Sequence, residues 1–325
     1  MIKVSVIIPI YKVEAFIERC ATTLMEQTLR EVEYIFVDDA TPDQSVRILE
    51  KVISCYPERK NHVHIIHHKE NKGLPAARNT GLSIASGKYV FHCDSDDYLE
   101  RDMLDIMVGE AERANADYVW CDYFLSYEKK ERYMKQPGYT SSNDALKGIL
   151  KGMMKYNVWN KIVRRSLYIE NNILFPDGYG LGEDMTMIKL LASSKKVVYV
   201  SRPLYHYVQY NSSSFTACSL SRNISALEHN TLDTIRFIKK RMSYSFEKEI
   251  NYFLLNVKLP LLISLNRKDF KQWESMYVSS NKFIWSNRDL SFRIRMIQWL
   301  ATKKLWSIIW LHNYLVYQVI YKIIY

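Results

Sequence analysis

The chain has 325 residues, of which 48% are hydrophobic and 25% are charged, so it can bury a core and is not an intrinsically disordered protein. Its five cysteines are scattered and form no C-x-x-C pair, which argues against a disulfide framework or a zinc site and favours a reducing cytosol. All of the net charge of +10 lies in the last third, because residues 1–219 hold 28 basic and 28 acidic side chains whereas residues 220–325 hold 17 and 7.

Two patterns alternate over the first 121 residues. Apolar, β-branched runs predict strands over residues 3–10, 32–37, 62–67, 89–93 and 118–121. Apolar residues at helical spacing predict helices over residues 13–27, 42–55, 74–83 and 100–114. The second of these helices would open with a capping box formed by Thr41 and Gln44. This alternation predicts a parallel sheet with right-handed crossovers, and the first strand is too β-branched for a signal peptide, so we expect no export.

Beyond residue 121 the alternation breaks. Residues 123–157 are polar and rich in Tyr and Lys, and we interpret them as an insertion or an excursion at the sheet edge. The next expected elements are an extended stretch at 159–165, a short helix at 166–171, a glycine-rich loop at 178–184, a helix at 185–193 and a strand at 197–200. From residue 220 to the end the chain has no glycine and a single proline, which predicts a helical region.

Acidic residues directly follow two of the predicted strands, as Asp38 and Asp39 after the second and as Asp94, Asp96 and Asp97 after the fourth. The strands of a parallel sheet point the same way, so these acids should gather along one sheet edge, where open α/β sheets bind their ligands. Paired carboxylate oxygens suit Mg²⁺ or Mn²⁺, and such an ion suits a diphosphate.

Helix capping is the alternative role for several of these side chains, since Ser and Asp are common cap residues. Ser95 or Asp97 would cap a helix beginning near Tyr98. Asp39, beside Thr41, would cap the helix that follows the second strand. Both roles remain open on the sequence alone.

Seven fragments carry a resemblance over roughly residues 3–210. In chain order they read VSVIIPIYK, IFVDDATPD, NKGLPAARNTG, GKYVFHCDSDD, WNKIVRRSL, GLGED and PLYHYVQYNSSS. This set resembles the family 2 glycosyltransferases of the GT-A fold, of the bacterial capsular and exopolysaccharide type. The resemblance implies an α/β fold class, with a Rossmann-like, mainly parallel sheet flanked by helices in a catalytic domain over residues 1–219. Its nucleotide-sugar half would span about 1–122 and its acceptor half about 123–219, before a mostly helical region at 220–325.

On the nucleotide-sugar side, the resemblance implies six binding residues, namely Pro9, Tyr11, Asp39, Arg78, Asp94 and Ser95. Asp39 would accept the ring N–H of uracil, and Asp94 would touch the ribose. Arg78 would lie near the base and the diphosphate, where a guanidinium suits phosphate oxygens, and a solvated surface arginine is its alternative.

The resemblance also implies that Asp96 holds Mn²⁺ or Mg²⁺ at the two phosphates, where the ion offsets charge on the departing nucleoside diphosphate. His206 would complete the metal shell or contact the diphosphate, and a hydrogen-bonded strand histidine is the alternative. Serines at residues 212–214 match a loop that closes over the nucleotide sugar, although Asn211 stands where the family often has glycine.

An acidic pair, Glu183 and Asp184, matches the E-D motif of the family. The resemblance implies that Asp184 is the general base, which takes the proton of the acceptor hydroxyl as it attacks the anomeric carbon. Alternatively, both acids only open the following helix, where its dipole favours them. Glu183 would share the acceptor side with Trp159, Asn160 and Lys161 of the W-N-K motif, and core packing is the alternative for Trp159.

The last third combines cations with aromatic side chains, most densely at residues 292–306. This pattern suits an anionic membrane surface, whereas residues 305–325 contain too many polar side chains for a good membrane-spanning helix. A helical subdomain that packs on the catalytic domain, or on a second copy in a homo-oligomer, is the alternative. Nucleic acid is not expected as a partner, because no recognition fold accompanies the charge.

We therefore expect an inverting, metal-dependent glycosyltransferase, a hexosyltransferase that moves a sugar from a nucleotide-sugar, UDP-linked, to a lipid-linked glycan acceptor in bacterial surface polysaccharide biosynthesis. It would be cytoplasmic and peripheral on the inner face of the cell membrane. A nucleotidyltransferase or an NAD-dependent reductase would need a glycine-rich loop after the first strand, which residues 9–12 do not provide. A non-catalytic scaffold or partner subunit of a polysaccharide assembly complex is the remaining alternative, and the intact acids argue against it.

Overall fold

The computed structural model describes residues 1–211, 224–242 and 246–318. The chain divides into two compact units. We call the first, Met1–Leu146 with Tyr156–Ala217, the α/β unit, and the second, Lys147–Lys155 with Cys218–Tyr325, the helical unit. A short segment from the middle of the chain therefore belongs with the C-terminal third.

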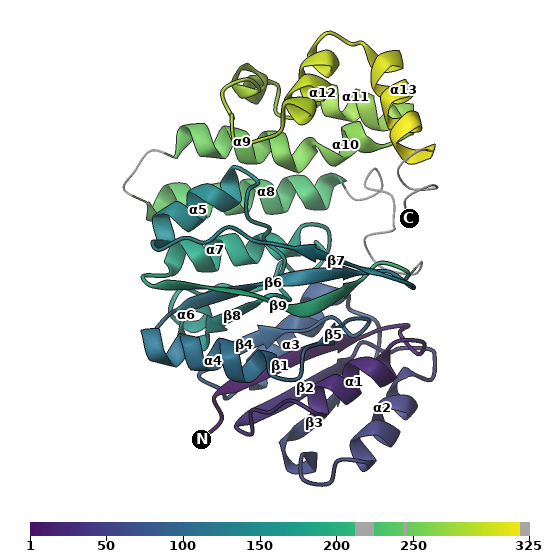
Figure 1. Cartoon of the computed structure of the whole chain (residues 1–325), viewed down its shortest axis with the longest axis vertical. Coiled ribbons are helices and arrows are strands. Elements are labelled where there is room, and N and C mark those ends of the chain that lie inside the picture. Colours follow the sequence, from purple (N-terminus) through teal and green to yellow (C-terminus); the bar gives the residue numbers. More distant parts are fainter. Residues whose placement is uncertain (212–223, 243–245, 319–325) are drawn as a thin grey trace. The chain divides into compact units, whose positions relative to one another are not determined.

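One curled, nine-stranded sheet forms the centre of the α/β unit (Figure 1). Across the sheet the strands follow the order β3 (Val63–His67), β2 (Val32–Asp38), β1 (Val4–Ile10), β4 (Tyr89–His92), β8 (Lys161–Arg164), β6 (Tyr118–Ser126), β9 (Val197–Val208) and β5 (Tyr98–Leu99), and β7 (Glu131–Met134) pairs with β6. The first four strands run parallel, as predicted. The other half is mixed, because β8 is antiparallel to both of its neighbours while β6 and β9 are parallel to each other.

The sequence explains these elements locally. β1 and β2 are buried along their whole length, which is why both read as nearly continuous apolar runs. Helix α1 (Ile17–Met25) buries Ile17, Cys20 and Leu24, which are spaced to lie on one helical face. Further helices of this unit are α2 (Ser45–Ser54), α3 (Leu74–Ile84), α4 (Met103–Ala114), α6 (Arg165–Glu170) and α7 (Thr186–Ser193).

The helix predicted from residue 100 begins later, at Met103, because Tyr98 and Leu99 form the short strand β5 and pair with β9. Pairing with a strand that lies more than a hundred residues away overrides the local preference for helix. No helix begins near Tyr98, so the capping role considered for Ser95 and Asp97 is wrong.

The capping box predicted for the second helix does not form either. α2 begins at Ser45, and the hydroxyl of Thr41 donates to Asp43 at 2.8 Å. The N–H of Gln44 donates to the Glu14 carboxylate at 3.0 Å, so a side chain from outside the helix satisfies it.

The interpretation of residues 123–157 as an insertion or an edge excursion is right only in part, because residues 123–126 continue β6 and pair with β9 within the sheet. β6 runs on to Ser126, and β7 then pairs back onto β6 as an outer strand. Helix α5 (Ser142–Leu150) follows, and its last turn crosses from the α/β unit into the helical unit.

The helical unit confirms the predicted helical C-terminal region over its described residues. Its helices are α8 (Ile224–Arg241), α9 (Glu247–Lys258), α10 (Pro260–Ile263), α11 (Arg267–Ser275), α12 (Phe292–Thr302) and α13 (Trp306–Val316). The apolar core that joins the last four helices consists of Leu261, Leu262, Phe270, Trp273, Met276, Ile297, Ala301 and Ile309.

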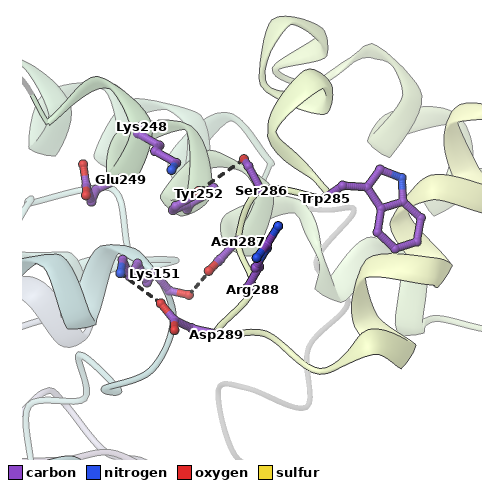
Figure 2. Close-up of a pocket in the computed structure, with 9 residues that line it drawn as sticks. All are labelled: Lys151, Lys248, Glu249, Tyr252, Trp285, Ser286, Asn287, Arg288 and Asp289. Atoms are coloured by element: carbon purple, nitrogen blue, oxygen red, sulfur yellow. Dashed lines mark hydrogen bonds and ion pairs between the residues drawn. The ribbon is translucent and has the colours of Figure 1, made fainter.

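Polar contacts bind the segment 147–155 into this unit (Figure 2). The side-chain amides of Asn256 and Asn287 each donate at 3.2 Å, to the carbonyl oxygens of Leu150 and Lys151 respectively. The ammonium of Lys151 pairs with Asp289 at 2.9 Å. A polar pocket of about 390 Å³ lies beside this ion pair.

Candidate functional site

Three neighbouring parallel strands end at one edge of the sheet and bring the acidic clusters to it. β1 lies between β2 and β4. The N–H of Asp39 donates to the carbonyl oxygen of Ile10 at 3.0 Å, and that of Cys93 donates to the carbonyl oxygen of Ile7 at 3.0 Å. The residues that follow β2 and β4 therefore flank the end of β1, as the topology predicts.

Asp39 is buried, and both of its carboxylate oxygens already have partners. Oδ1 lies 2.7 Å from Nδ1 of His68 and accepts from the N–H of Lys72 at 2.8 Å, while Oδ2 accepts from the N–H of Gly73 at 2.8 Å. Gly73 has a φ of 88° and directly precedes α3, so Asp39 fixes the turn that leads into that helix. The capping role considered for Asp39 beside Thr41 is wrong, because the N–H of Thr41 donates to the carboxylate of Asp38 and not to that of Asp39. Oδ2 keeps one acceptor position, since a carboxylate oxygen has two lone pairs.

Arg78, on α3, joins the acids of two loops. Its side chain is 1% exposed, so the solvated alternative is wrong. Nη2 donates to Oδ1 of Asp94 at 2.8 Å, and Nε lies 3.7 Å from Oε1 of Glu183. Burial lowers the pKa of Arg78, but Asp94, Glu183 and Asp184 together raise it above the usual value, so the guanidinium stays charged. Nε and Nη1 have no hydrogen-bond partner among the described residues.

Asp94 and Asp96 are the two partly exposed acids after β4. Burial, and next the charge of Asp94, raise the pKa of Asp96 to about 6, and a nearby cation would offset both effects. In the part of the chain that the structure describes, no three His, Cys, Asp or Glu side chains are grouped to hold a metal by themselves. Two carboxylates completed by phosphate oxygens and water are, however, a common way for proteins to hold Mg²⁺, so the residues present fit such an ion.

Asp97, the third acid, is fully buried and has a structural role. Oδ1 accepts from the N–H of Val208 at 2.8 Å, and Oδ2 accepts from the hydroxyl of Tyr205 at 2.7 Å. The same hydroxyl accepts from the N–H of Asp94 at 3.2 Å. Asp97 therefore fastens the end of β9 to the loop after β4.

Glu183 and Asp184 lie in the 3₁₀ turn Glu183–Met185 that leads into α7, so they do open a helix, and this placement is compatible with catalysis. Burial, and next the charge of Asp184, hold the pKa of Glu183 well above its usual range. Burial also raises the pKa of Asp184, to about 6, against the opposing charges of Arg78 and Lys161. Asp184 is partly exposed, and no hydrogen bond of its side chain is found among the described residues. Such a carboxyl group can accept a proton near neutral pH.

The W-N-K motif is buried. The amide of Asn160 donates to the carbonyl oxygen of Cys121 at 2.8 Å and accepts from Nζ of Lys161 at 2.6 Å. Burial lowers the pKa of Lys161 to about 7, although the negative charge of Asp184 acts in the opposite direction and raises it. Trp159 is 4% exposed, and its ring stacks on that of Tyr205 at 4.7 Å. It therefore packs in the core, which was the alternative to a role on the acceptor side.

The remaining nucleotide-side residues differ in access. Pro9 is buried within β1, opposite Val37 of β2. Ser95 is 6% exposed, whereas Tyr11 is 42% exposed just beyond the end of β1. Of these three, Tyr11 therefore offers an accessible face at this sheet edge.

His206 does not lie with Asp96. Its Nδ1 is 2.7 Å from Oε1 of Glu131 and its Nε2 is 2.9 Å from Oε1 of Glu100, and its ring stacks on Tyr98 at 4.2 Å. Side chains alternate between the two faces of a strand. Because Tyr205 faces the acidic loop after β4, the next residue, His206, faces the other side. It is the hydrogen-bonded strand histidine of the alternative, and both ring nitrogens are already engaged.

Two residues of this site were not assigned a role from the sequence. Tyr205 contacts both Asp94 and Asp97, and Asn211 contacts Asp96. Both fall within the matching fragment PLYHYVQYNSSS, which was the available signal. The serines at residues 212–214 lie outside the described residues.

Three comparisons with known proteins identify the family and the fold of this chain. A family model described as glycosyl transferase family 2 matches residues 5–179, which is more than half of the chain. Among curated proteins, the chain is similar to the glycosyltransferase EpsJ of Bacillus subtilis (strain 168), with 29% identity over 273 residues that cover 80% of this chain and 77% of EpsJ.

Solved structures support the predicted fold. TarS of S. aureus in complex with UDP-GlcNAc matches with a TM-score of 0.67 and 18% identity, over 98% of this chain and 92% of that one. A mannosyltransferase from Pyrobaculum calidifontis in complex with GDP-Man and Mn²⁺ matches with a TM-score of 0.53 and 17% identity, over 94% of this chain and 87% of that one.

Proposed function

This chain belongs to the family 2 glycosyltransferases, and we propose that it moves a sugar with inversion from a UDP-sugar to a hydroxyl group of a glycan. Asp184 carries the proposal. It is a carboxylate without a hydrogen-bond partner among the described residues, with its pKa raised to about 6 and with Arg78 and Lys161 as its countercharges. A group that is ionised at neutral pH and can still accept a proton is what deprotonation of a sugar hydroxyl needs.

For the nucleotide, we assign the ring N–H of uracil to Oδ2 of Asp39. That oxygen accepts one hydrogen bond, from Gly73, and can accept another. The exposed ring of Tyr11, at the end of β1, would cover the base, with Pro9 behind it. The UDP-GlcNAc complex of TarS, a protein of similar fold, supports a uridine nucleotide.

For the phosphates, we assign Mn²⁺ or Mg²⁺ to Asp96, as the resemblance implies, and we add Asp94 as a second ligand in place of its expected contact with the ribose, with Ser95 between them. When bound, such an ion offsets the negative charge that develops on the UDP leaving group. The Mn²⁺ complex of the mannosyltransferase of similar fold supports a divalent ion as the cofactor. We leave His206 out, because both of its ring nitrogens face carboxylates.

For the reaction, Asp184 would take the proton of the acceptor hydroxyl. The hydroxyl oxygen would attack the anomeric carbon at the same time, while the bond from that carbon to UDP breaks. Glu183 is buried against Arg78, so it is not available as a nucleophile for a second displacement. A single displacement inverts the anomeric centre. Asn160 and Lys161 would support the acceptor side, where Lys161 helps to keep Asp184 ionised.

For the acceptor, we propose a lipid-linked glycan at the inner face of a bacterial cell membrane. No helix in the described ranges is both long and apolar enough to cross a bilayer. Trp306 and Trp310 pack against the core of the helical unit, so the outer surface of α13 consists of other side chains. Ile308, Leu311 and Leu315 are 50%, 52% and 51% exposed at spacings of three and four residues, which places them on one face. No acidic residue follows Asp289, whereas several basic residues do, as an anionic surface requires.

The test is turnover by the purified chain with a panel of UDP-sugars, Mn²⁺ and a lipid-linked glycan. We expect UDP release that depends on the acceptor and, from an α-linked UDP-sugar, a β-linked product by NMR. An α-linkage would contradict inversion. Binding of UDP-sugars without any transfer or hydrolysis would favour a non-catalytic scaffold instead.

A further inference from the structure

The end of β9 is fastened to the acidic loop after β4 by two neighbouring contacts. The buried Asp97 accepts from the backbone of Val208 and from the hydroxyl of Tyr205, two residues of β9. The chain continues from Val208 for three residues to Asn211. Because Asp97 fixes Val208, it also fixes where Asn211 can reach.

Asn211 reaches Asp96. Its side-chain amide nitrogen Nδ2 donates to Oδ2 of Asp96 at 2.7 Å. This hydrogen bond takes one acceptor position of Oδ2, and no side chain among the described residues donates to Oδ1. It also limits rotation of the Asp96 carboxylate, because the hydrogen bond from Asn211 forms only over a narrow range of the Asp96 side-chain torsion angles.

We propose that Asn211 is a positioning residue for the divalent ion, which holds the Asp96 carboxylate so that Oδ1 is presented to the metal. The inference rests on the proposed function, because it takes Asp96 as a ligand. Side chains that orient metal ligands contribute strongly to metal affinity, and their loss typically weakens binding about 10- to 100-fold. An asparagine keeps this contact without adding charge, whereas a glycine at this position would leave Asp96 free to rotate.

Mn²⁺ affinity in the presence of UDP, measured from the free Mn²⁺ signal by electron paramagnetic resonance, tests the proposal. We expect Asn211→Ala to weaken Mn²⁺ binding about 10-fold or more. Asn211→Gln, which keeps the amide donor on a longer side chain, should recover part of the loss. Gln209→Ala is the matched control, because Gln209 lies at the same strand end and its amide donates only to the carbonyl oxygen of Val208 among the described residues.

The outcomes separate the inference from the proposed function. If the parent binds Mn²⁺ with UDP and Asn211→Ala binds it equally well or more tightly, Asn211 does not position the ligand and the inference fails alone. If the parent binds UDP but no Mn²⁺, the metal assignment falls as well. Thermal unfolding without metal should be the same for Asn211→Ala and Gln209→Ala. An Mn²⁺ loss that only accompanies a lower melting temperature would overturn the positioning role.

Discussion

Two buried lysines, one in each unit, show how differently the two units use charge. Lys161 in the α/β unit and Lys258 in the helical unit are 1% and 0% exposed, and burial lowers the pKa of each to about 7. Lys258 donates at 2.8 Å to Met276 and at 2.8 Å to Asn281, and no acidic group contributes to its pKa. Lys161 acts on a carboxylate, Asp184. A shifted pKa alone therefore does not mark a functional site, and what matters is which charge the shifted group faces.

The two units also differ in how their buried cations are paired. Lys258 lies 4.0 Å from the ring of Trp273 and is enclosed by its hydrogen-bond acceptors. Arg78 pairs with two acids, yet two of its nitrogens have no hydrogen bond among the described residues. Burying polar groups that are incompletely satisfied costs stability. Both units bury some polar atoms without a hydrogen-bond partner, and the difference is that in the α/β unit they include a charged guanidinium that faces acidic side chains.

The largest expected effect would come from removing the proposed base, Asp184. Asp184→Asn should lower kcat about 10²–10⁴-fold, the contribution of a positioned general base, while UDP and Mn²⁺ still bind. The same variant should not lower the melting temperature, because it removes a charge that burial disfavours. Initial rates and thermal unfolding measure the two effects.

Asp177→Asn is the control for this experiment, because Asp177 is an exposed acid that directly precedes the glycine-rich loop 178–184. Its rate should stay within about twofold of the parent. An Asp184→Asn variant as fast as the parent would remove Asp184 from the mechanism, and a Glu183→Gln variant slower than Asp184→Asn would point to the neighbouring acid.

The second effect compares the two buried cations. Arg78→Gln removes the cation that pairs with Asp94 and lies beside the buried carboxyl group of Glu183, so it should lower the free energy of unfolding by about 3–5 kcal/mol. Lys258→Met removes donors from two neutral acceptors and should cost only about 1–3 kcal/mol. Urea unfolding followed by circular dichroism measures both values. The reverse order of costs would mean that the acids around Arg78 are neutral in the folded protein.

The third effect is a pH dependence that belongs to the α/β unit. The proposed base, Asp184, must be ionised to accept a proton, and burial raises its pKa to about 6, so kcat/KM should fall about tenfold per pH unit below that value. Lys161→Met removes a positive charge that lowers the pKa of Asp184, and it should move this acid limb to higher pH. A flat profile between pH 5 and 8 would contradict the assignment of Asp184.

These tests rest on residues that the sequence predicted to different degrees. The acids after β2 and β4 were predictable, because a strand and the residues that follow it are local in sequence and parallel strands end together. The positions of His206 and Asn211 were not, because they depend on the pairing of β5 with β9 across more than a hundred residues. That pairing aligns Tyr98 with His206 and thereby sets which face each residue of β9 presents.

The sequence also left open which aromatic residues of the last third are exposed. Composition predicted a basic, aromatic helical region, and the structure separates its buried side chains from its exposed ones. Trp306 stacks on Phe270 at 5.6 Å inside the helical unit, and Ile297 and Ile309 belong to the core. Truncation after residue 291 would therefore remove core side chains, so single substitutions are the better test of membrane binding.

The smallest expected effect is that of single basic residues on the helical unit. Arg293 and Lys303 form no ion pair within the described ranges, so each should contribute about 1 kcal/mol to binding of an anionic bilayer, or about fivefold in affinity. Arg293→Gln and Lys303→Gln should each weaken partitioning onto phosphatidylserine-containing vesicles by this factor, and added salt should weaken the parent too. Lys69→Gln, an exposed lysine of the α/β unit, is the control and should change nothing. Binding that ignores both substitutions and salt would rule out the electrostatic contact, and a parent that never binds vesicles would leave packing on protein as the role of the exposed α13 face.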